Sequence, residues 1–345
     1  MKKIFINIFL FLLFSGNLLA QWGSYAGSFA RLGFGARGLA MGNAMVSNIY
    51  GDVAGYYNPS LACFQEDVVI NLGYTFLNLD RKLNFVGLAK KFKIPNQPSG
   101  GAGITLGWIN SGVGNIDIRD NDAKHLEYAS TYENQFYLGT GFLLSDNFAI
   151  GVAFKLYNAK LYTDVTTSSI AFDFGALYKE NDNLAIGFSV KDISARYKWE
   201  TSKLYGNLGG TTENKFPTLW NLGGSYRIPN KRGSASLEFE MQYNPVFITN
   251  KETGEKSERN NNYYFKAGVE YNLSSNPDMP IIVRAGIDRI ELASDDFTGN
   301  LKPGFGISFS KLFSKNVILG VDYSFQYEPY SLYPIQNLGI SFKFK

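Results

Sequence analysis

Residues 316–327 read N-V-I-L-G-V-D-Y-S-F-Q-Y, and this stretch decides the fold class. Val317, Leu319 and the apolar residues at every second position after them alternate with small or polar residues such as Asp322. A period of two is typical of a β-strand with one apolar face. The same pattern recurs in 234–243 and over the last nine residues, where carboxylates and ammonium groups share the opposite face. The sequence therefore indicates amphipathic strands.

The N-terminus separates a membrane barrel from a soluble sandwich, because the strands of both alternate. Residues 1–20 begin with two lysines, continue with an apolar run from Ile4 to Phe14 and end in a short polar patch at Ala20. This is the pattern of a secretory signal peptide. A membrane anchor is the alternative, and it is disfavoured because a spanning helix needs roughly 20 apolar residues.

The composition agrees with an exported barrel. Aromatic residues make up 16% of the chain, with 22 Tyr and 28 Phe, which suits aromatic girdles at two membrane interfaces. A single Cys and a single His argue against a disulfide scaffold, a Cys/His metal site and any cofactor that depends on one. Loss of the signal removes two of the 33 Lys and Arg, which then nearly balance 30 Asp and Glu, so nothing suggests nucleic acid as a partner.

Fourteen alternating segments fill residues 67–345. An even number fits a closed antiparallel barrel with both termini in the periplasm, and most segments reach the roughly 9–11 residues that a tilted membrane strand needs. The prediction is an all-β protein, a 14-stranded antiparallel transmembrane β-barrel. The expected strands are 67–77, 82–93, 100–110, 135–144, 148–162, 165–179, 183–194, 216–229, 233–244, 261–273, 279–291, 301–313, 316–328 and 336–345.

The connections between these strands alternate in length. We expect tight periplasmic turns at Ser145–Asn147, Glu180–Asp182 and Ser314–Lys315, and long polar extracellular loops at 111–134, 195–215 and 245–260, with one short outer loop at Asn78–Arg81. Long loops on one side and short turns on the other are typical of bacterial outer-membrane barrels. The predicted location is the bacterial outer membrane.

Residues 21–66 precede the first strand and are predicted to form a plug. The segment holds eight glycines and mixes small residues with aromatic ones in no strand-like period. Fourteen strands enclose a lumen too wide for wall side chains to fill. We expect a compact plug inside the barrel, with a short helix near Leu39–Val46. A disordered periplasmic tail is the alternative, and the aromatic residues disfavour it.

Two motifs could suggest enzymatic chemistry. Gly33-Phe-Gly-Ala-Arg-Gly38 matches the dinucleotide-binding pattern GxGxxG, but no βαβ unit surrounds it, so turning glycines are the better interpretation. His125 lies beside Lys124 and Glu127 in a long loop, where it could suggest a serine esterase or lipase. No GxSxG nucleophile elbow accompanies it, so a solvated histidine is the better interpretation. The sequence predicts no catalytic, cofactor-binding or metal-binding residue, and hence no enzyme.

Charged residues on the polar faces of the strands are expected to line the lumen. The carboxylates could form a selectivity ring, but pairing with lysines in a wet interior is favoured. The candidate lumen charges are Asp173, Glu238, Glu240, Asp322, Lys155, Lys179 and Lys343.

Residues 31–62 resemble the plug signature of the PorV/PorQ group, within the FadL-like outer-membrane barrel superfamily. The resemblance rests on R-L-G-F-G-A-R-G-L-A-M-G-N-A from Arg31 and D-V-A-G-Y-Y-N-P-S-L-A from Asp52. This chain has Asn43 where the family has a second glycine, and it ends in Lys345 rather than in an aromatic residue. The family's fourteen strands agree with the count above. The matching plug-motif residues are Arg37, Gly38, Met41, Gly42, Asp52, Asn58 and Pro59.

The motif residues are expected to hold the N-terminal segment in place inside the lumen. Arg37 is expected to pair with carboxylates of the wall, Gly38 and Gly42 to allow close approach, and Asn58-Pro59 to fix a turn.

The resemblance implies two classes of function. PorV and PorQ imply a non-enzymatic role in type IX protein secretion, in which outer loops receive secreted cargo proteins and pass them to other secretion components. FadL-like transporters imply instead the passage of long-chain fatty acids or other hydrophobic small molecules. A structural porin-like barrel explains least. Secretion is favoured because the plug motif is closer to that group and because 111–134 and 195–215 are mostly polar. Outer-membrane lipid is the expected surrounding in each case.

Overall fold

The computed structural model describes residues 25–52, 55–65, 67–94, 101–162, 164–230, 232–244, 247–249, 256–258, 261–291, 300–329, 331 and 333–345. The predicted signal peptide, residues 1–20, lies outside these ranges. Among the described residues, no helix is both long enough and apolar enough to cross a membrane.

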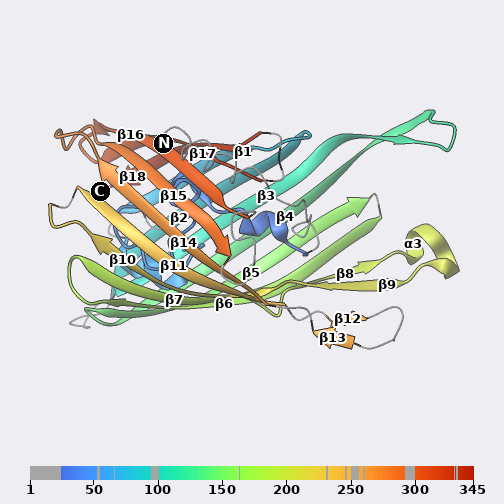
Figure 1. The fold of residues 1–345 in the computed structure, drawn as a ribbon, viewed down its shortest axis with the longest axis horizontal. Helices are drawn as coiled ribbons and strands as arrows, with labels where there is room; N and C mark the ends of the chain where they lie inside the picture. Colours follow the sequence, from blue (N-terminus) through green and yellow to red (C-terminus); the bar gives the residue numbers. More distant parts are fainter. Residues whose placement is uncertain are drawn as a thin grey trace, which may run out of the picture.

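Fourteen antiparallel strands close into a barrel, which confirms the predicted fold class (Figure 1). Pairing of β1 with β18, from Val68↔Phe344 to Phe76↔Gln336, closes the cylinder. The barrel strands are β1 Val68–Phe76, β2 Arg81–Lys93, β3 Gly101–Arg119, β4 His125–Ser145, β5 Phe148–Tyr162, β6 Val165–Lys179, β7 Leu184–Ile193, β10 Thr218–Arg227, β11 Gly233–Tyr243, β14 Asn262–Asn272, β15 Ile281–Glu291, β16 Lys302–Ser314, β17 Val317–Gln326 and β18 Ile335–Phe344. Most strand ends agree with the predicted ones within a residue or two.

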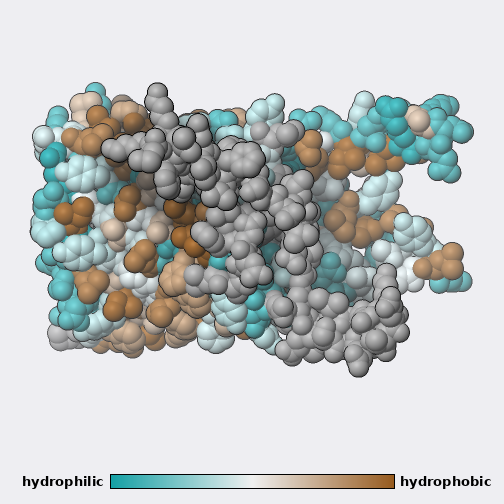
Figure 2. Space-filling model, viewed as in Figure 1, coloured by the Kyte–Doolittle hydropathy of each residue, from teal (hydrophilic) through white to brown (hydrophobic). Residues whose placement is uncertain are grey.

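The apolar stripe of each strand points outwards. On β17 the side chains of Val321, Tyr323 and Phe325 are exposed, whereas Ser324 and Gln326 between them are buried. Figure 2 shows hydrophobic residues spread over the outside of the barrel, with hydrophilic ones at its left rim and over much of the upper projecting tip. An apolar exterior around a polar interior is the arrangement of a membrane barrel and the reverse of a soluble sandwich.

One end of the barrel carries tight turns and the other carries long hairpins. We call them the short-turn end and the long-hairpin end. The predicted loop 111–134 is wrong in its extent, because β3 and β4 continue as a paired ribbon to Arg119↔His125 and leave only a short turn. The ribbon projects at the upper right of Figure 1.

A second hairpin occupies most of the predicted loop 195–215. It consists of β8 Arg196–Glu200, α3 Ser202–Tyr205, η4 Gly206–Leu208 and β9 Thr211–Lys215. Tyr197 and Trp199 lie within the range predicted as a loop, yet they are buried together with Tyr157 and Phe216. The backbone N–H groups of Arg196 and Lys198 donate to side-chain hydroxyls of β6. The base of this hairpin therefore belongs to the core, and only its tip projects. In the predicted loop 245–260, a third hairpin pairs β12 Phe247–Thr249 with β13 Lys256–Glu258.

Residues 25–52 and 55–65, here called the lumenal segment, lie inside the barrel (Figure 1, blue). They contain η2 Ser28–Arg31, α2 Gly35–Ala40 and η3 Pro59–Phe64. Helix α2 contacts β15–β18 and β1, and η3 contacts β2–β6, so the segment reaches opposite walls.

The helix predicted near Leu39–Val46 is misplaced, because α2 ends at Ala40. Gly42 and Asn43 have φ values of 59° and 57°. This left-handed conformation stops an α-helix.

Candidate functional site

A belt of inward-facing glycines receives the lumenal segment. A Cβ atom on any of them would overlap an atom of residues 39–63, so only glycine allows this close approach. The wall glycines and the lumenal residues they meet are Gly103 with Ala62, Gly141 with Cys63, Gly151 with Ser60, Gly175 with Asn58, Gly187 and Gly223 with Val46, Gly268 and Gly286 with Met41, and Gly304 with Leu39. The lumenal segment is thus fitted to nine wall strands, β3–β7, β10 and β14–β16.

Met41 and Gly42 of the plug motif dock on a β-bulge in β15. The register of β14 and β15 shifts between Phe265 and Ala267. A Cβ on Gly42 would overlap the backbone of Ile287 at this bulge. Beside it, Asn43 Nδ2 donates to Asp288 Oδ2 at 2.9 Å. The left-handed turn at Gly42 and Asn43 packs directly against the backbone of the bulge. Helix α2 therefore ends at Ala40, just before this turn.

Asn58 and Pro59 begin the 3₁₀-helix η3. The Asn58 side chain accepts a hydrogen bond from Ser60 N at 3.1 Å, which caps the helix, and Pro59 occupies its first position. Asn58 Nδ2 also donates to the carbonyl oxygens of Val46, Ala176 and Phe188. Asn58 therefore joins the turn to strands β6 and β7.

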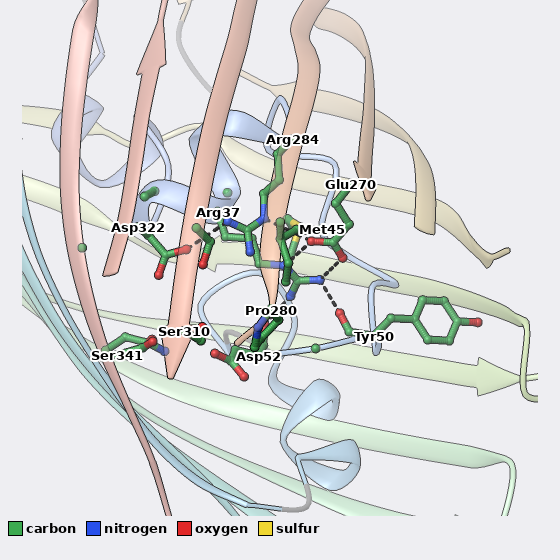
Figure 3. A pocket seen from close by; sticks show the side chains of 18 of the residues that line it. Arg37, Met45, Tyr50, Asp52, Glu270, Pro280, Arg284, Ser310, Asp322 and Ser341 are labelled. Atoms are coloured by element: carbon green, nitrogen blue, oxygen red, sulfur yellow. Dashed lines mark hydrogen bonds and ion pairs between the residues drawn. The ribbon is translucent and has the colours of Figure 1, made fainter. Parts of the chain in front are cut away.

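Arg37 is the centre of the hydrogen-bond network at the short-turn end (Figure 3). Its guanidinium contacts the wall carboxylate of Glu270 at 2.5 and 3.0 Å. It also donates to the carbonyl oxygens of Tyr50 and Asp52 and to Asn48 Oδ1. Burial disfavours the charged guanidinium, but the Glu270 carboxylate more than offsets this and raises the pKa of Arg37. Arg37 therefore ties helix α2 to both the 48–52 turn and strand β14.

Gly38 leaves room for the side chain of Tyr57. A Cβ there would overlap the Tyr57 hydroxyl, which donates to Asn43 Oδ1 at 2.8 Å. The motif residues thus meet one another as well as the wall.

Most candidate lumen charges pair with partners that lie on other strands. Asp173 pairs with Lys155 at 2.7 Å, and Asp322 pairs with Arg284 at 2.9 Å. Glu238 and Glu240 share Lys266, at 3.1 and 2.6 Å. Sequence analysis missed the partners Lys266, Arg284, Glu270 and Asp192, although each lies on the polar face of its strand or at a bulge.

Two of the predicted lysine pairings are wrong. Lys179 lies at the rim beside a tight turn and pairs with Asp182, whose side chain is 79% exposed, because β6 ends there. Lys343 pairs with Asp52 of the lumenal segment at 2.5 Å rather than with a wall carboxylate. Lys343 therefore adds a second ion pair between wall and lumenal segment.

Two larger cavities flank the lumenal segment. A cavity of about 280 Å³ at the short-turn end is lined by Arg37, Asp52, Glu270 and Arg284, with serines of β16 and β18 (Figure 3). A cavity of about 360 Å³ at the long-hairpin end is lined by Arg31, Glu133, Lys302 and Glu328, with aromatic residues between them. Of the plug-motif residues, Arg37, Gly38 and Asp52 line the first of these cavities.

The structure places the remaining candidates as follows. His125 lies on the exposed part of β4, with Nδ1 2.6 Å from Asp117 Oδ1. Gly33 and Gly35 have φ values of 118° and 76° and turn the backbone into α2. Within the described part of the chain, no three His, Cys, Asp or Glu side chains are grouped to hold a metal ion.

Comparison with known proteins gives a family and a fold. The family described as type IX secretion system membrane protein PorP/SprF matches residues 40–344. The match is not to PorV/PorQ, so that more specific assignment is not confirmed. No curated protein matches the chain.

Solved structures of FadL-like barrels have the same fold. CymD, a monoaromatic hydrocarbon channel, has a TM-score of 0.63 at 12% identity, covering 91% of this chain and 98% of that one. A Pseudomonas aeruginosa FadL homologue has a TM-score of 0.58 at 11% identity, with coverage of 90% and 99%. The Pseudomonas putida toluene transporter TodX has a TM-score of 0.57 at 12% identity, with coverage of 90% and 96%. At this identity the likeness concerns the fold alone.

Proposed function

Because this chain belongs to the PorP/SprF family of type IX secretion membrane proteins, we propose that it handles exported cargo proteins at the bacterial outer membrane. In this proposal its partners are cargo chains and other secretion components. The signature in residues 31–62, which resembles that of PorV and PorQ, supports a shared mechanism in which the barrel stays closed while its outer hairpins receive cargo.

In this proposal the long-hairpin end faces the cell exterior. Long connections on one side and tight turns on the other support this orientation, as does the position of the C-terminal strand end beside the tight turns.

The observation that carries the proposal is the pair of hairpins that project from this end. Their tips hold large apolar side chains exposed to solvent: Leu126 at 60% and Tyr128 at 68% on β4, and Tyr205 at 63% and Leu208 at 93% on the β8–β9 tip. Exposed apolar and aromatic residues on a polar surface are typical of protein-binding sites. A channel would have no need of such tips.

We further propose that residues 21–66 act as a plug. The glycine belt, the docking of Gly42 on the β15 bulge and the Arg37 network all support a fixed closure. Arg37→Ala removes contacts to both the 48–52 turn and β14, so it is expected to make the barrel leaky.

A second candidate is transport of hydrophobic small molecules. The FadL-like architecture and the apolar part of the lining of both cavities favour it. The ion pairs and polar groups that line the cavity at the short-turn end disfavour it, because an apolar solute would have to pass them.

The test separates the two functions by removing one hairpin tip. Residues 201–210 are replaced by a short Gly-Ser turn, which spares the buried Tyr197 and Trp199. We expect cargo secretion to fall and long-chain fatty-acid uptake to stay unchanged. The control is an equivalent replacement of Asn181–Asp182 at the short-turn end. Normal secretion with lost fatty-acid uptake would favour transport over secretion.

A further inference from the structure

The strand ends beside the closing seam of the barrel carry many lysines. Strands β16, β17, β18, β1 and β2 are neighbours in the wall, and β1 pairs with β18 at the seam. Within the described residues of their short-turn ends, seven lysines stand against one carboxylate side chain, that of Asp67. We call these lysines the seam lysines: Lys90, Lys91, Lys93, Lys311, Lys315, Lys343 and Lys345.

This excess of positive charge is concentrated at one end of the five strands. At their long-hairpin ends, the described residues include Arg81, Lys82 and Lys302, which Asp80 and Glu328 nearly balance. Among the seam lysines, only Lys343 forms an ion pair within the described part of the chain, and its partner is Asp52 of the lumenal segment. Clustered like charges repel one another unless an opposite charge lies among them. The short-turn end is therefore suited to a negatively charged partner.

Part of this charge lies on the inner side of the wall. Side chains alternate between the two faces along a strand. Phe92 and Phe344 are exposed on the outer surface, so Lys91, Lys93 and Lys343 beside them lie on the lumenal side. Lys343 also lines the cavity at the short-turn end. Lipid surrounds the outer surface of a barrel, whereas its interior is polar and wet. The inner lysines therefore favour a partner that covers the barrel end from the aqueous side.

A row of polar side chains lies inside this end, in the cavity lined by Arg37. Register aligns Ser310, Gly320, Ser341 and Asn71 across β16, β17, β18 and β1. A Cβ on Gly320 would lie 2.3 Å from Ser341 Oγ and 3.2 Å from Ser310 Oγ, so the two hydroxyl groups flank an open position (Figure 3). We call Ser310, Ser341 and Asn71 around Gly320 the seam niche.

The side chains of the seam niche have no partner of their own. Ser310, Ser341 and Asn71 line the cavity, and within the described residues none of their side chains makes a hydrogen bond. Ser341 is nevertheless only 8% exposed. Buried polar groups are rarely left unsatisfied unless water or a ligand bonds to them. The seam niche thus offers hydroxyl and amide donors to a group that enters it.

The charged side chains of the cavity make it a site for an anion. Arg227 and Arg232 have no carboxylate partner, because the first lies over the ring of Tyr50 and the second donates to backbone carbonyl oxygens. Guanidinium, ammonium and hydroxyl donors together suit a carboxylate. Five cations and three carboxylates line the cavity: Arg37, Arg227, Arg232, Arg284 and Lys343, with Asp52, Glu270 and Asp322.

The spread of the seam lysines indicates the size of the partner. Neighbouring strands lie about 4.8 Å apart, so five strands cover roughly 20 Å of the barrel end. A single small anion does not reach across this distance, whereas about six residues of extended chain do.

We propose that the short-turn end binds an acidic, extended segment of a partner protein, with one carboxylate group in the seam niche and others on the seam lysines. In the proposed orientation this end faces the periplasm, so the segment belongs to another secretion component rather than to cargo at the cell surface. The inference therefore rests on the proposed function and names the chemistry of one partner.

The test measures binding of fluorescent hexaglutamate to the full mature chain in nanodiscs of zwitterionic lipid. We expect hexaglutamate to bind and hexaglutamine not to bind. The affinity for hexaglutamate should fall several-fold between about 0.05 and about 0.5 M salt, because salt screens the charges. Lys91→Gln, Lys93→Gln and Lys345→Gln together should lower the affinity several-fold. The matched control combines Lys82→Gln, Lys198→Gln and Lys215→Gln, three exposed lysines of the long-hairpin end, and should bind like the wild type.

A second variant tests the seam niche. Ser310→Ala with Ser341→Ala removes two neutral donors, so the affinity for hexaglutamate should fall several-fold while its salt dependence stays unchanged. Ser324→Ala is the control, since Ser324 is a buried serine of β17 that does not line the cavity. The gel mobility of unheated samples shows that each variant is folded.

Three results would overturn the inference. Equal binding of hexaglutamate by the wild type and the seam-lysine variant would show that these lysines hold no acidic chain. Loss of binding when the nanodiscs contain anionic lipid would assign the lysines to lipid headgroups. In cells, the seam-lysine variant should secrete less cargo, and normal secretion despite lost hexaglutamate binding would show that the partner is not a secretion component. Failure of the proposed function is recognised separately, by normal secretion after replacement of residues 201–210.

Discussion

At the scale of single residues, this barrel depends on charges that are buried but compensated. Lys266 lies between Glu238 and Glu240, and each of the three side chains is nearly inaccessible to solvent. Two backbone N–H groups of the lumenal segment, from Met45 and Val46, donate to Glu238 as well. A buried carboxylate that loses its cation is costly, whereas a surface pair contributes little.

Lys266→Met is therefore expected to destabilise the folded barrel strongly, by about 3–5 kcal/mol. The matched control is Lys179→Met, which removes an ion pair at the rim and should cost at most about 1 kcal/mol. Urea unfolding in vesicles, followed by gel mobility of unheated samples, measures both. Equal losses of folding free energy in the two variants would show that water in the interior compensates a carboxylate that has lost its cation.

Wall glycines give a second prediction at this scale. Gly268→Ala would force a methyl group into the Met41 backbone, so we expect a loss of about 1–3 kcal/mol from overpacking. Gly224→Ala is the control, since a Cβ there meets only one atom, 3.9 Å away. Thermal unfolding of the two variants gives the comparison. A stable Gly268→Ala protein would mean that the lumenal segment shifts freely.

At the scale of elements, the β8–β9 hairpin divides into a buried base and a projecting tip. Tyr197 and Trp199 anchor the base in the core, while the tip is ordered by Glu200, which accepts hydrogen bonds from Ser202 and Thr211. These bonds lower the pKa of Glu200 from 4.5 to about 2. The charged carboxylate therefore favours the ordered tip.

Because the pKa of Glu200 is lowered, the β8–β9 tip is expected to lose order at low pH. The contribution of Glu200 is complete above pH 4.5 and is lost as the pH falls through about 2. A fluorophore on a cysteine introduced at Asn207 should gain mobility over that interval, as measured by anisotropy. Glu200→Gln should show no such transition. A transition of equal size in Glu200→Gln would assign it to another group.

At the scale of the whole molecule, the apolar outer surface distinguishes a membrane barrel from a soluble β protein. Leu222 lies near the middle of β10 and is 53% exposed on the outer surface. An arginine near the bilayer midplane costs about 2–4 kcal/mol in such barrels. Leu222→Arg should therefore lower folding into vesicles by this amount.

Leu126→Arg provides the control for that measurement. Leu126 is 60% exposed, similar to Leu222, but it lies on the projecting ribbon beyond the barrel. Its replacement should leave folding into vesicles unchanged. If both variants fold as well as the wild type, the outer surface of β10 does not contact lipid.

The sequence by itself determined the barrel. Alternation is a local property, because successive side chains of a strand point to opposite faces whatever the strand pairs with. For that reason the fourteen strands and their order of short and long connections could be predicted from neighbouring residues.

Only the tertiary structure decided where the chain meets itself across the lumen. Arg37 and Glu270 are 233 positions apart, and Lys343 reaches Asp52 from the other end of the chain. Helix α2 ends where Gly42 docks on the bulge of β15, not where local helix preference fades. Such contacts depend on the closure and register of the whole cylinder, which no window of neighbouring residues contains.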